Sequence, residues 1–245
     1  MPTILITGAA SGIGAAFLHH YASDPTNTII AVDRAPIALP EPAPAAKVTT
    51  HTLDLTSEAG IISLVSTTGL ATTPLDIVLH SAGIRGLEPT LHAANPHDVA
   101  SADSLSAMTP ETMLLTYHIN VIGTLTLLRA LLPGLRLAAS TSLPKVIVMG
   151  SRMGSIGYNS TGGGYAYRAS KAALNAVVKS LSIDVPEVVF LSVHPGRVET
   201  GLVLAREEGA ISVAESVENM LTLLSNVGRA DSGRFVDRWG VDIGW

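Results

Sequence analysis

The sequence predicts a doubly wound α/β fold, in which helices cover both faces of a mostly parallel sheet. Short runs of β-branched residues alternate with longer helix-like stretches along the 245 residues. Most of the short runs are apolar on both faces, as expected for parallel strands buried between two layers of helices. The apolar pattern belongs to one sheet throughout, so we expect a single domain over residues 1–245.

Strands and helices are expected to alternate along most of the chain. Strands are expected where β-branched and other apolar residues cluster, at residues 3–7, 28–33, 47–53, 75–80, 145–150 and 188–193. Helices are expected in the longer stretches between and after them, at residues 12–22, 57–66, 111–138, 165–184 and 213–226. Alternation of this kind is typical of α/β folds with a parallel sheet.

Two segments interrupt the alternation. Residues 34–47 contain four prolines, which predicts a loop in place of a helix. Residues 84–110 give no regular pattern, and a structureless loop of that length is unusual in a compact domain. This second segment is either a solvated insertion or part of the rim of a substrate site.

Composition excludes several classes of function. The chain has no cysteine, which excludes disulfides, thiol catalysis and cysteine zinc sites, and we expect no metal site. The net charge of -5 is spread along the chain without a basic cluster, so nucleic acid is not an expected partner. The N-terminal MPTILITG lacks the features of a signal peptide, and we see no apolar run of the roughly 18–20 residues needed to span a bilayer. We therefore expect a soluble, cytoplasmic protein.

A glycine-rich turn follows the first strand. In TGAASGIG, residues 7–14, Gly8, Gly12 and Gly14 allow a tight turn and close approach of a ligand to the backbone. A pyrophosphate could then lie on the free N–H groups of the following helix. The spacing differs from the common G-x-G-x-x-G, so alone the motif is a weak signal and could instead be a structural turn. An acid at the end of the second strand favours a dinucleotide site.

That acid, Asp33, predicts which cofactor binds. A carboxylate at this position accepts hydrogen bonds from ribose hydroxyls and repels a 2′-phosphate, which favours NAD. Arg34 could instead pair with that phosphate, so NADP remains possible. Asp54, at the end of the third strand, could contact the adenine ring, or could cap the backbone before Thr56.

Six motifs occur in a characteristic order: TGAASGIG at 7–14, HSAG at 80–83, Asn120 in HINVIG, Ser151, YRASK at 167–171 and PGRVET at 195–200. Together they resemble the short-chain dehydrogenase/reductase family over nearly the whole chain. SRMGSI at 151–156 and the ending DIGW resemble its carbonyl-reductase-like branch, which includes sniffer and C-factor proteins. The resemblance implies a Rossmann-type fold with a seven-stranded parallel sheet, and hydride transfer between a nicotinamide and a carbonyl or alcohol.

Tyr167 and Lys171 suit this chemistry because they lie four residues apart and so share one face of a helix. A nearby ammonium, with an oxidised nicotinamide, favours the phenolate and makes the tyrosine usable as a general acid or base. Ser151 would hydrogen-bond the substrate oxygen. The resemblance implies that Asn120 holds a water in a proton relay to Lys171. Considered singly, each of these residues could instead be structural.

The resemblance also implies the residues that bind the cofactor. Lys171 would hold the nicotinamide ribose, and Val198 and Thr200 would meet the carboxamide. The full set is Gly8, Ser11, Gly12, Ile13, Gly14, Asp33, Arg34, Asp54, Leu55, Ser81, Ala82, Gly83, Tyr167, Lys171, Pro195, Gly196, Val198 and Thr200.

The sequence departs from the family pattern near the serine. Ser151 precedes Tyr167 by sixteen residues, farther than is usual, whereas its rival Ser155 is twelve before it. We favour Ser151 because it ends a strand and stands three residues before Gly154. The additional residues would lie in the glycine-rich loop 157–164, where Tyr158 and Asn159 could touch substrate.

Two further departures concern other parts of the site. His80 replaces an asparagine of the usual NNAG motif, and a structural hydrogen-bonding role is favoured over an acid–base one. The resemblance implies that residues 201–213 form the substrate lid, which is short here. Tyr165 lacks a lysine at i+4, so it is expected to pack or to line the entrance.

The predicted function is thus an NAD(P)-dependent oxidoreductase that acts on a small, apolar carbonyl or alcohol. Two alternatives stay open: a non-redox enzyme (dehydratase, isomerase or cyclase) on the same scaffold, and a nucleotide-sensing regulatory protein. By analogy with the family, a homodimer or homotetramer is possible.

Overall fold

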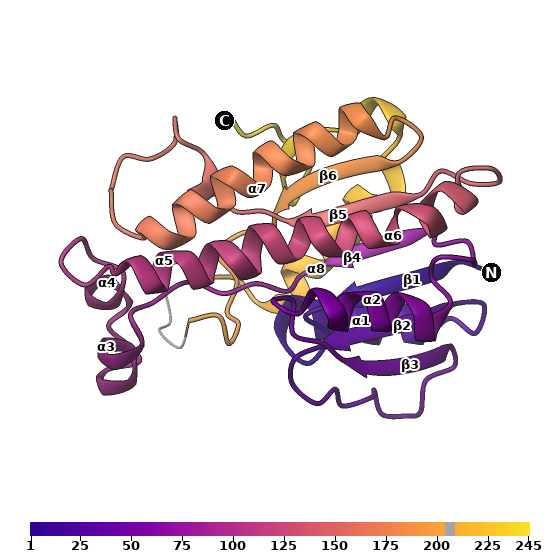
Figure 1. Cartoon of the computed structure of the whole chain (residues 1–245), viewed down its shortest axis with the longest axis horizontal. Helices are drawn as coiled ribbons and strands as arrows, with labels where there is room; N and C mark the ends of the chain where they lie inside the picture. Colours follow the sequence, from indigo (N-terminus) through magenta and orange to yellow (C-terminus); the bar gives the residue numbers. More distant parts are fainter. Residues whose placement is uncertain (204–208) are drawn as a thin grey trace.

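The computed structural model describes residues 1–203 and 209–245, and it confirms the doubly wound fold (Figure 1). Seven parallel strands form one sheet in the order β3-β2-β1-β4-β5-β6-β7. Their bounds are β1 (Thr3–Thr7), β2 (Thr28–Asp33), β3 (Lys47–Thr52), β4 (Ile77–His80), β5 (Lys145–Met149), β6 (Val189–His194) and β7 (Phe235–Asp237). The predicted lid at 201–213 lies partly outside the described residues, since it includes 204–208.

The order of the strands determines where a ligand can bind. The chain begins in the middle of the sheet at β1, proceeds outward to β3, and then returns to β4 on the other side of β1. The connections after β1 and β4 therefore leave on opposite sides, and a crevice opens at the carboxyl ends of these strands. In Figure 1 these ends lie on the left.

Helices cover both faces of the sheet. Their bounds are α1 (Gly12–Ala22), α2 (Glu58–Thr68), α3 (Pro89–Ala94), α4 (Val99–Ala102), α5 (Pro110–Tyr117), α6 (Thr124–Ala138), α7 (Tyr165–Asp184) and α8 (Val213–Asn226). One core is formed by α2, α6 and α7 against one face, with Leu127 and Phe190 fully buried in it. The other is formed by α1 and α8 against the opposite face, around Phe17 and Met220.

Local signals in the sequence explain where several helices begin and end. The Ser57 hydroxyl accepts a hydrogen bond from Gly60 N at 3.0 Å and caps α2, which ends at Gly69 in the left-handed conformation with φ 72°. Thr109 caps α5 in the same way, and Pro110 occupies the first turn, where its missing N–H costs nothing.

The segment 84–110 is not the structureless loop that the sequence predicts. It contains α3 and α4, whose first turns are capped by the carboxylates of Glu88 and Asp98. Glu88 N also donates to Ala102 O at 2.8 Å, which closes the segment on itself. The proline-rich segment 34–47, in contrast, forms no helix, as predicted.

The long helix predicted at 111–138 has an interruption. The helical run Pro110–Ala138 is continuous, but its middle turn, His118–Gly123, is a π-helix (η1) that contains Asn120. Of the described helices, this run alone is long and apolar enough to cross a membrane by length and composition. Half of its most apolar stretch is buried against the rest of the protein, as expected for a helix of the core.

Candidate active site

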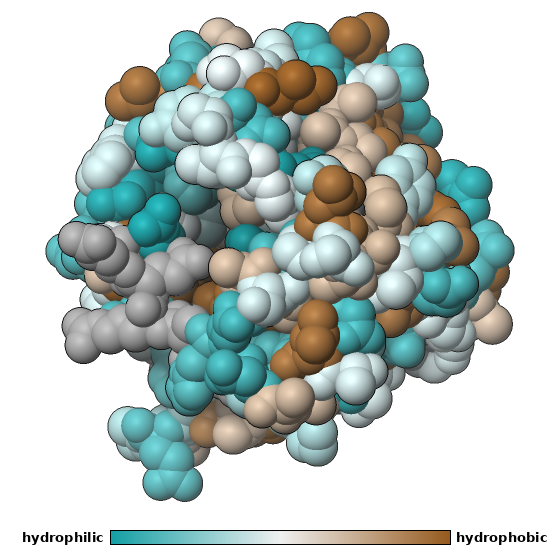
Figure 2. All heavy atoms as spheres, turned by 90° about the vertical axis from the view of Figure 1, so that its left-hand side faces the viewer, coloured by the Kyte–Doolittle hydropathy of each residue, from teal (hydrophilic) through white to brown (hydrophobic). Residues whose placement is uncertain are grey.

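A cavity of about 460 Å³ lies at the carboxyl ends of the central strands. Figure 2 looks at this end of the molecule, where hydrophilic atoms border a depression. Most of the predicted cofactor residues line the cavity: Gly8, Ser11, Gly12, Ile13, Gly14, Asp33, Arg34, Asp54, Leu55, Ser81, Ala82, Gly83, Tyr167, Lys171, Pro195 and Thr200. The predicted residues Gly196, Val198, Asn120 and Ser151 are not among the lining residues.

The glycine-rich turn requires its glycines. Gly8 and Gly12 have φ of 68° and 55°, in the left-handed region that favours glycine. A Cβ on Gly14 would lie 2.1 Å from Gly8 O, so no side chain fits there. The N-cap residue of α1, Ser11, makes no side-chain capping bond, which leaves the first N–H groups of this helix available to an anion.

The Asp33 carboxylate is already engaged by the backbone. One oxygen accepts from Ala10 N and the other from Ala35 N, both at 2.9 Å, so this residue braces the glycine-rich turn. Arg34 beside it is exposed at the cavity. The Asp54 carboxylate accepts from the N–H and hydroxyl of Thr56, which also lowers the pKa of Asp54. Asp54 therefore has the capping role that was the alternative to adenine contact, although it also lines the cavity.

The end of β4 presents a polar group with no partner. The Ser81 hydroxyl is buried at the cavity and makes no hydrogen bond to any described residue. Buried polar groups are normally bonded, so this hydroxyl fits a ligand that supplies the missing partner. The cavity also has the free N-terminus of α1, Lys171 and a suitable size. With the Ser81 hydroxyl, these features suit a nicotinamide dinucleotide.

Tyr167 and Lys171 lie together at the first turns of α7, and both are buried. Lys171 Nζ donates to Met149 O at 2.7 Å and lies 5.6 Å from the centre of the Tyr167 ring. Burial lowers the pKa of Lys171 to about 8, so the ammonium form still dominates at neutral pH. Tyr165 is 39% exposed whereas Tyr167 is 7% exposed, so the two tyrosines differ as expected.

Asn120 is held by protein groups on all sides. Its amide nitrogen donates to Ile84 O at 2.9 Å and to Ser170 Oγ at 3.0 Å, and its amide oxygen accepts from Ile84 N at 2.9 Å. The side chain thus joins the π turn to the segment after β4 and to α7. This arrangement matches the structural alternative for Asn120, and its water-holding role stays a prediction.

The two rival serines have different surroundings. The Ser155 hydroxyl donates to Gly244 O and accepts from Tyr158 N, so it links the loop after β5 to the C-terminal stretch. The Ser151 hydroxyl accepts only a 3.2 Å bond from Met153 N among the bonds of the described residues. Its own proton therefore remains available for a substrate oxygen, which favours Ser151.

His80 has the structural role that the sequence favours. Its ring bridges Thr7 Oγ1 at 2.9 Å and Thr124 Oγ1 at 2.8 Å, and burial lowers its pKa to about 3. Because Thr124 Oγ1 donates to Asn120 O and Thr7 Oγ1 accepts from Ala82 N, the chain of bonds has one direction and assigns the proton to Nε2. Burial likewise lowers the pKa of His194 to about 4.

One pair of residues at the site was missed by the sequence reasoning. Arg85 lines the cavity, and its guanidinium forms a 2.8 Å ion pair with Asp103. The guanidinium carbon lies 5.0 Å from the centre of the Tyr167 ring. No local signal marks this pair, because both residues belong to a segment without periodicity.

The fold and the cavity define an α/β dinucleotide-binding protein, since the glycine-rich turn and Asp33 meet at the crevice beside β1. The chain belongs to the short chain dehydrogenase family: the sequence model described by that name matches residues 2–210. It is therefore an oxidoreductase of this family, as predicted.

Three relatives support the predicted branch. The chain is 38% identical to C-signal of Myxococcus xanthus over 73% of this chain and 97% of that protein. It is similar to the NADPH-bound carbonyl reductase from chicken fatty liver, with 28% identity, a TM-score of 0.81 and coverage of 100% and 99%. It is also similar to the carbonyl reductase Sniffer of D. melanogaster, with 27% identity, a TM-score of 0.83 and full coverage of both chains.

Proposed function

We propose that the protein reduces a small carbonyl compound, or oxidises the corresponding alcohol, with Tyr167 as proton donor or acceptor. The observation that carries this proposal is the buried pair of Tyr167 and Lys171 at the cavity. Both residues are retained at helical spacing, which argues against a regulatory protein that has lost its chemistry. The carbonyl reductases among the structural relatives support a carbonyl substrate.

The chain supplies the proton and the electrostatics of the reaction. A bound reduced nicotinamide would supply the hydride to the carbonyl carbon. Tyr167 donates its phenolic proton to the carbonyl oxygen, and Lys171 stabilises the phenolate that remains. Ser151 donates to the same oxygen and stabilises the charge that develops there. Reduction thus converts the carbonyl to an alcohol with one hydride and one proton.

The cofactor that we propose is NADP(H), although Asp33 alone favours NAD. Both Asp33 oxygens are bonded to backbone N–H groups, which offsets part of the charge that would repel a 2′-phosphate. Arg34 is exposed beside it and can approach that phosphate. The NADPH-bound carbonyl reductase supports the same choice. Binding of NADPH and NADH to Arg34→Ala tests it: only the NADPH affinity is expected to fall, by about tenfold. Equal losses for both cofactors would refute the role of Arg34.

The central test uses Tyr167→Phe, with Tyr165→Phe as a matched control on the same helical turn. Oxidation of NADPH is followed at the reduced nicotinamide absorbance band with a panel of ketones and aldehydes. We expect Tyr167→Phe to lose at least about a hundredfold in kcat while its NADPH affinity stays within a few fold. Retention of activity in Tyr167→Phe would exclude the mechanism. Product formation without NADPH oxidation would favour a dehydratase, isomerase or cyclase.

We also propose that the chain forms a homodimer or homotetramer, and that it acts in the cytoplasm. The helical run α5–η1–α6 carries exposed apolar side chains, among them Leu114, Leu115 and Ile122. Burial of such side chains between copies would stabilise an oligomer. Sedimentation of the wild type and of Leu114→Asp tests this point, and a monomeric wild type would refute it.

A further inference from the structure

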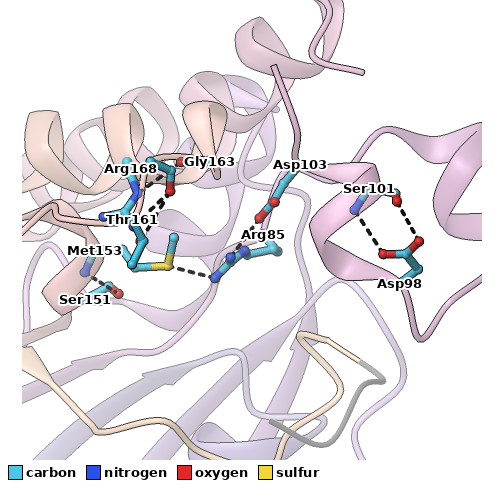
Figure 3. A network of polar contacts seen from close by, with 10 residues as sticks. Arg85, Asp98, Ser101, Asp103, Ser151, Met153, Thr161, Gly163 and Arg168 are labelled. Atoms are coloured by element: carbon cyan, nitrogen blue, oxygen red, sulfur yellow. Dashed lines mark hydrogen bonds and ion pairs between the residues drawn. The ribbon is translucent and has the colours of Figure 1, made fainter. Parts of the chain in front are cut away.

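Arg85 belongs to the segment 84–110 and occupies an unusual place, against the first turn of α7. Figure 3 shows its guanidinium between Asp103 and Met153. Nη2 pairs with the Asp103 carboxylate at 2.8 Å, and Nη1 donates to Met153 Sδ at 2.9 Å. The guanidinium carbon lies over the Tyr167 ring. Arg85 therefore connects three parts of the chain that are far apart in sequence.

This arrangement is costly for a purely structural arginine. Nε is buried and makes no hydrogen bond to any described residue, and a thioether is only a weak acceptor for Nη1. The side chain of Arg85 is 14% exposed and that of Asp103 is 9% exposed, so both charges have lost most of their water. Unsatisfied buried donors call for an explanation, and functional sites are where they are most often tolerated.

The benefit lies at Tyr167, whose ring has two cations close to it. The Arg85 carbon is 5.0 Å from the ring centre and Lys171 Nζ is 5.6 Å from it. An opposite charge at such a distance stabilises an ionised group, and a guanidinium also interacts favourably with the face of a ring. Each cation therefore favours the phenolate that forms when Tyr167 gives up its proton.

We propose that Arg85 is a positioning residue that, together with Lys171, adjusts how readily Tyr167 releases its proton, and that Asp103 limits the effect. Asp103 opposes Arg85 because its negative charge reduces the positive potential at the ring. The proposal rests on the proposed function of Tyr167. It assigns a role to the segment 84–110, which carries both Arg85 and Asp103.

The surroundings hold this pair in place. Asp103 O accepts from Gly164 N at 2.9 Å, which joins the segment to the glycine-rich loop. Gly164 has φ 59°, and a Cβ there would lie 2.7 Å from Met153 Cε. The left-handed backbone at this position favours glycine, which also leaves room for the end of the Met153 side chain. The glycine-rich loop before α7 therefore helps to hold the ion pair in place, in addition to lengthening the chain between Ser151 and Tyr167.

Other charged groups near α7 make their hydrogen bonds and ring contacts elsewhere, although the Arg168 guanidinium lies near enough to Arg85 and Asp103 to interact electrostatically with both. Arg168 donates to Gly163 O and Thr161 Oγ1 in the loop, and the Arg152 guanidinium lies 4.9 Å from the Tyr158 ring. The face of α5 that packs on α7 is uncharged, with Thr112 and Thr116 buried. The remaining titratable groups on the elements packed against α7 are Glu111, Tyr117, His118 and His194.

The test measures ionisation of Tyr167 directly, without substrate or cofactor. The tyrosinate absorbance of each variant is titrated from pH 7 to 11, and the same titration in the Tyr167→Phe background is subtracted, which isolates Tyr167 from the other four tyrosines. We expect Arg85→Met to raise the midpoint by roughly one pH unit. Asp103→Asn removes the opposing charge and is expected to lower the midpoint. Arg85→Lys keeps the charge and is expected to restore most of the shift.

Arg152→Met is the matched control, because it removes an arginine stacked on a different tyrosine, and its Tyr167 midpoint is expected to stay unchanged. Near-UV circular dichroism and thermal unfolding show which variants are folded. If Asp103→Asn does not fold, the comparison of Arg85→Met with Arg85→Lys decides. Shifts of the same sign in Arg85→Met and Asp103→Asn, or no shift in Arg85→Met, would overturn the proposal.

This readout separates the proposal from the proposed function. If Tyr167→Phe retains activity, Tyr167 is not the proton donor, yet the titration still reports whether Arg85 affects its ionisation. If Tyr167→Phe is inactive and the Arg85→Met midpoint is unchanged, the proposed function stands and only the role of Arg85 fails. The pH at half-maximal kcat/KM is expected to move with the titration midpoint in each variant.

Discussion

His80 makes the stability of the protein depend on pH, and the size of the effect follows from its burial. The folded pKa of about 3 lies below the ordinary value of 6.5, because burial and the nearby Lys171 disfavour the protonated ring. A depressed pKa means that the unfolded chain binds the proton more tightly. The stabilisation is therefore complete above pH 6.5 and is lost progressively as the pH falls from 6.5 towards 3.

The expected loss is large enough to measure. With these two values, linkage gives about 2 kcal/mol less free energy of unfolding at pH 5 than at pH 8 from His80 alone. His80→Asn removes the titrating group but keeps a side chain that can hydrogen-bond. The difference in free energy of unfolding between wild type and His80→Asn is then expected to shift by about 2 kcal/mol between the two pH values.

The assay is urea unfolding of both proteins at pH 8 and pH 5, at matched ionic strength. His194, whose pKa is also lowered by burial, contributes to both proteins and cancels in the comparison. The lost bonds to Thr7 and Thr124 contribute an offset that does not change with pH. A difference between wild type and variant that is the same at both pH values would refute the reasoning.

Three further predictions concern the site. Ser151→Ala is expected to lower kcat by about a hundredfold and to lose only the small stabilisation of its one 3.2 Å bond from Met153 N. Ser155→Ala, which loses two bonds, is expected to keep kcat and to lose about 1–2 kcal/mol of free energy of unfolding. Equal effects in both assays would contradict the choice of Ser151. Gly14→Ala places a methyl group 2.1 Å from Gly8 O, so a loss of at least about 2 kcal/mol in urea unfolding is expected. NADPH affinity measured by calorimetry is expected to fall as the pH passes about 8, where Lys171 loses its charge, and to be flat there in Lys171→Met; a parallel pH dependence in both proteins would exclude Lys171.

Much of the fold could be predicted because its signals are local. The bounds of α1 and α7 match the predicted 12–22 and 165–184, and a glycine-rich turn marks the start of each helix. The six predicted strands agree with the structure to within two residues. β7 was not found by pattern because Phe235–Asp237 is too short to show alternation, and only pairing with β6 makes it a strand.

The candidate site was predictable where a motif carries its own chemistry and not where chemistry depends on tertiary contact. Tyr167 and Lys171 are neighbours on one helix, so spacing alone places them together. Arg85 approaches Tyr167 only once the segment 84–110 has folded into short helices. The sequence of this segment shows no periodicity from which those helices could be predicted. Thr7 and Thr124 are far from His80 in sequence, so its bridging role could be favoured but its partners could not be named.

The π turn at His118–Gly123 sets how far α5 is rotated about the helix axis relative to α6. A π turn accommodates one residue more than an α-helical turn, and each residue of an α-helix rotates the chain by about 100°. Deletion of a single residue here would leave α6 seated on the sheet and swing α5 around its axis by that angle. Thr112 and Thr116 would then turn away from α7, and Asn120 would leave Ile84. A deletion of one residue in this helix would therefore be tolerated only with new side chains throughout the interface between α5 and α7.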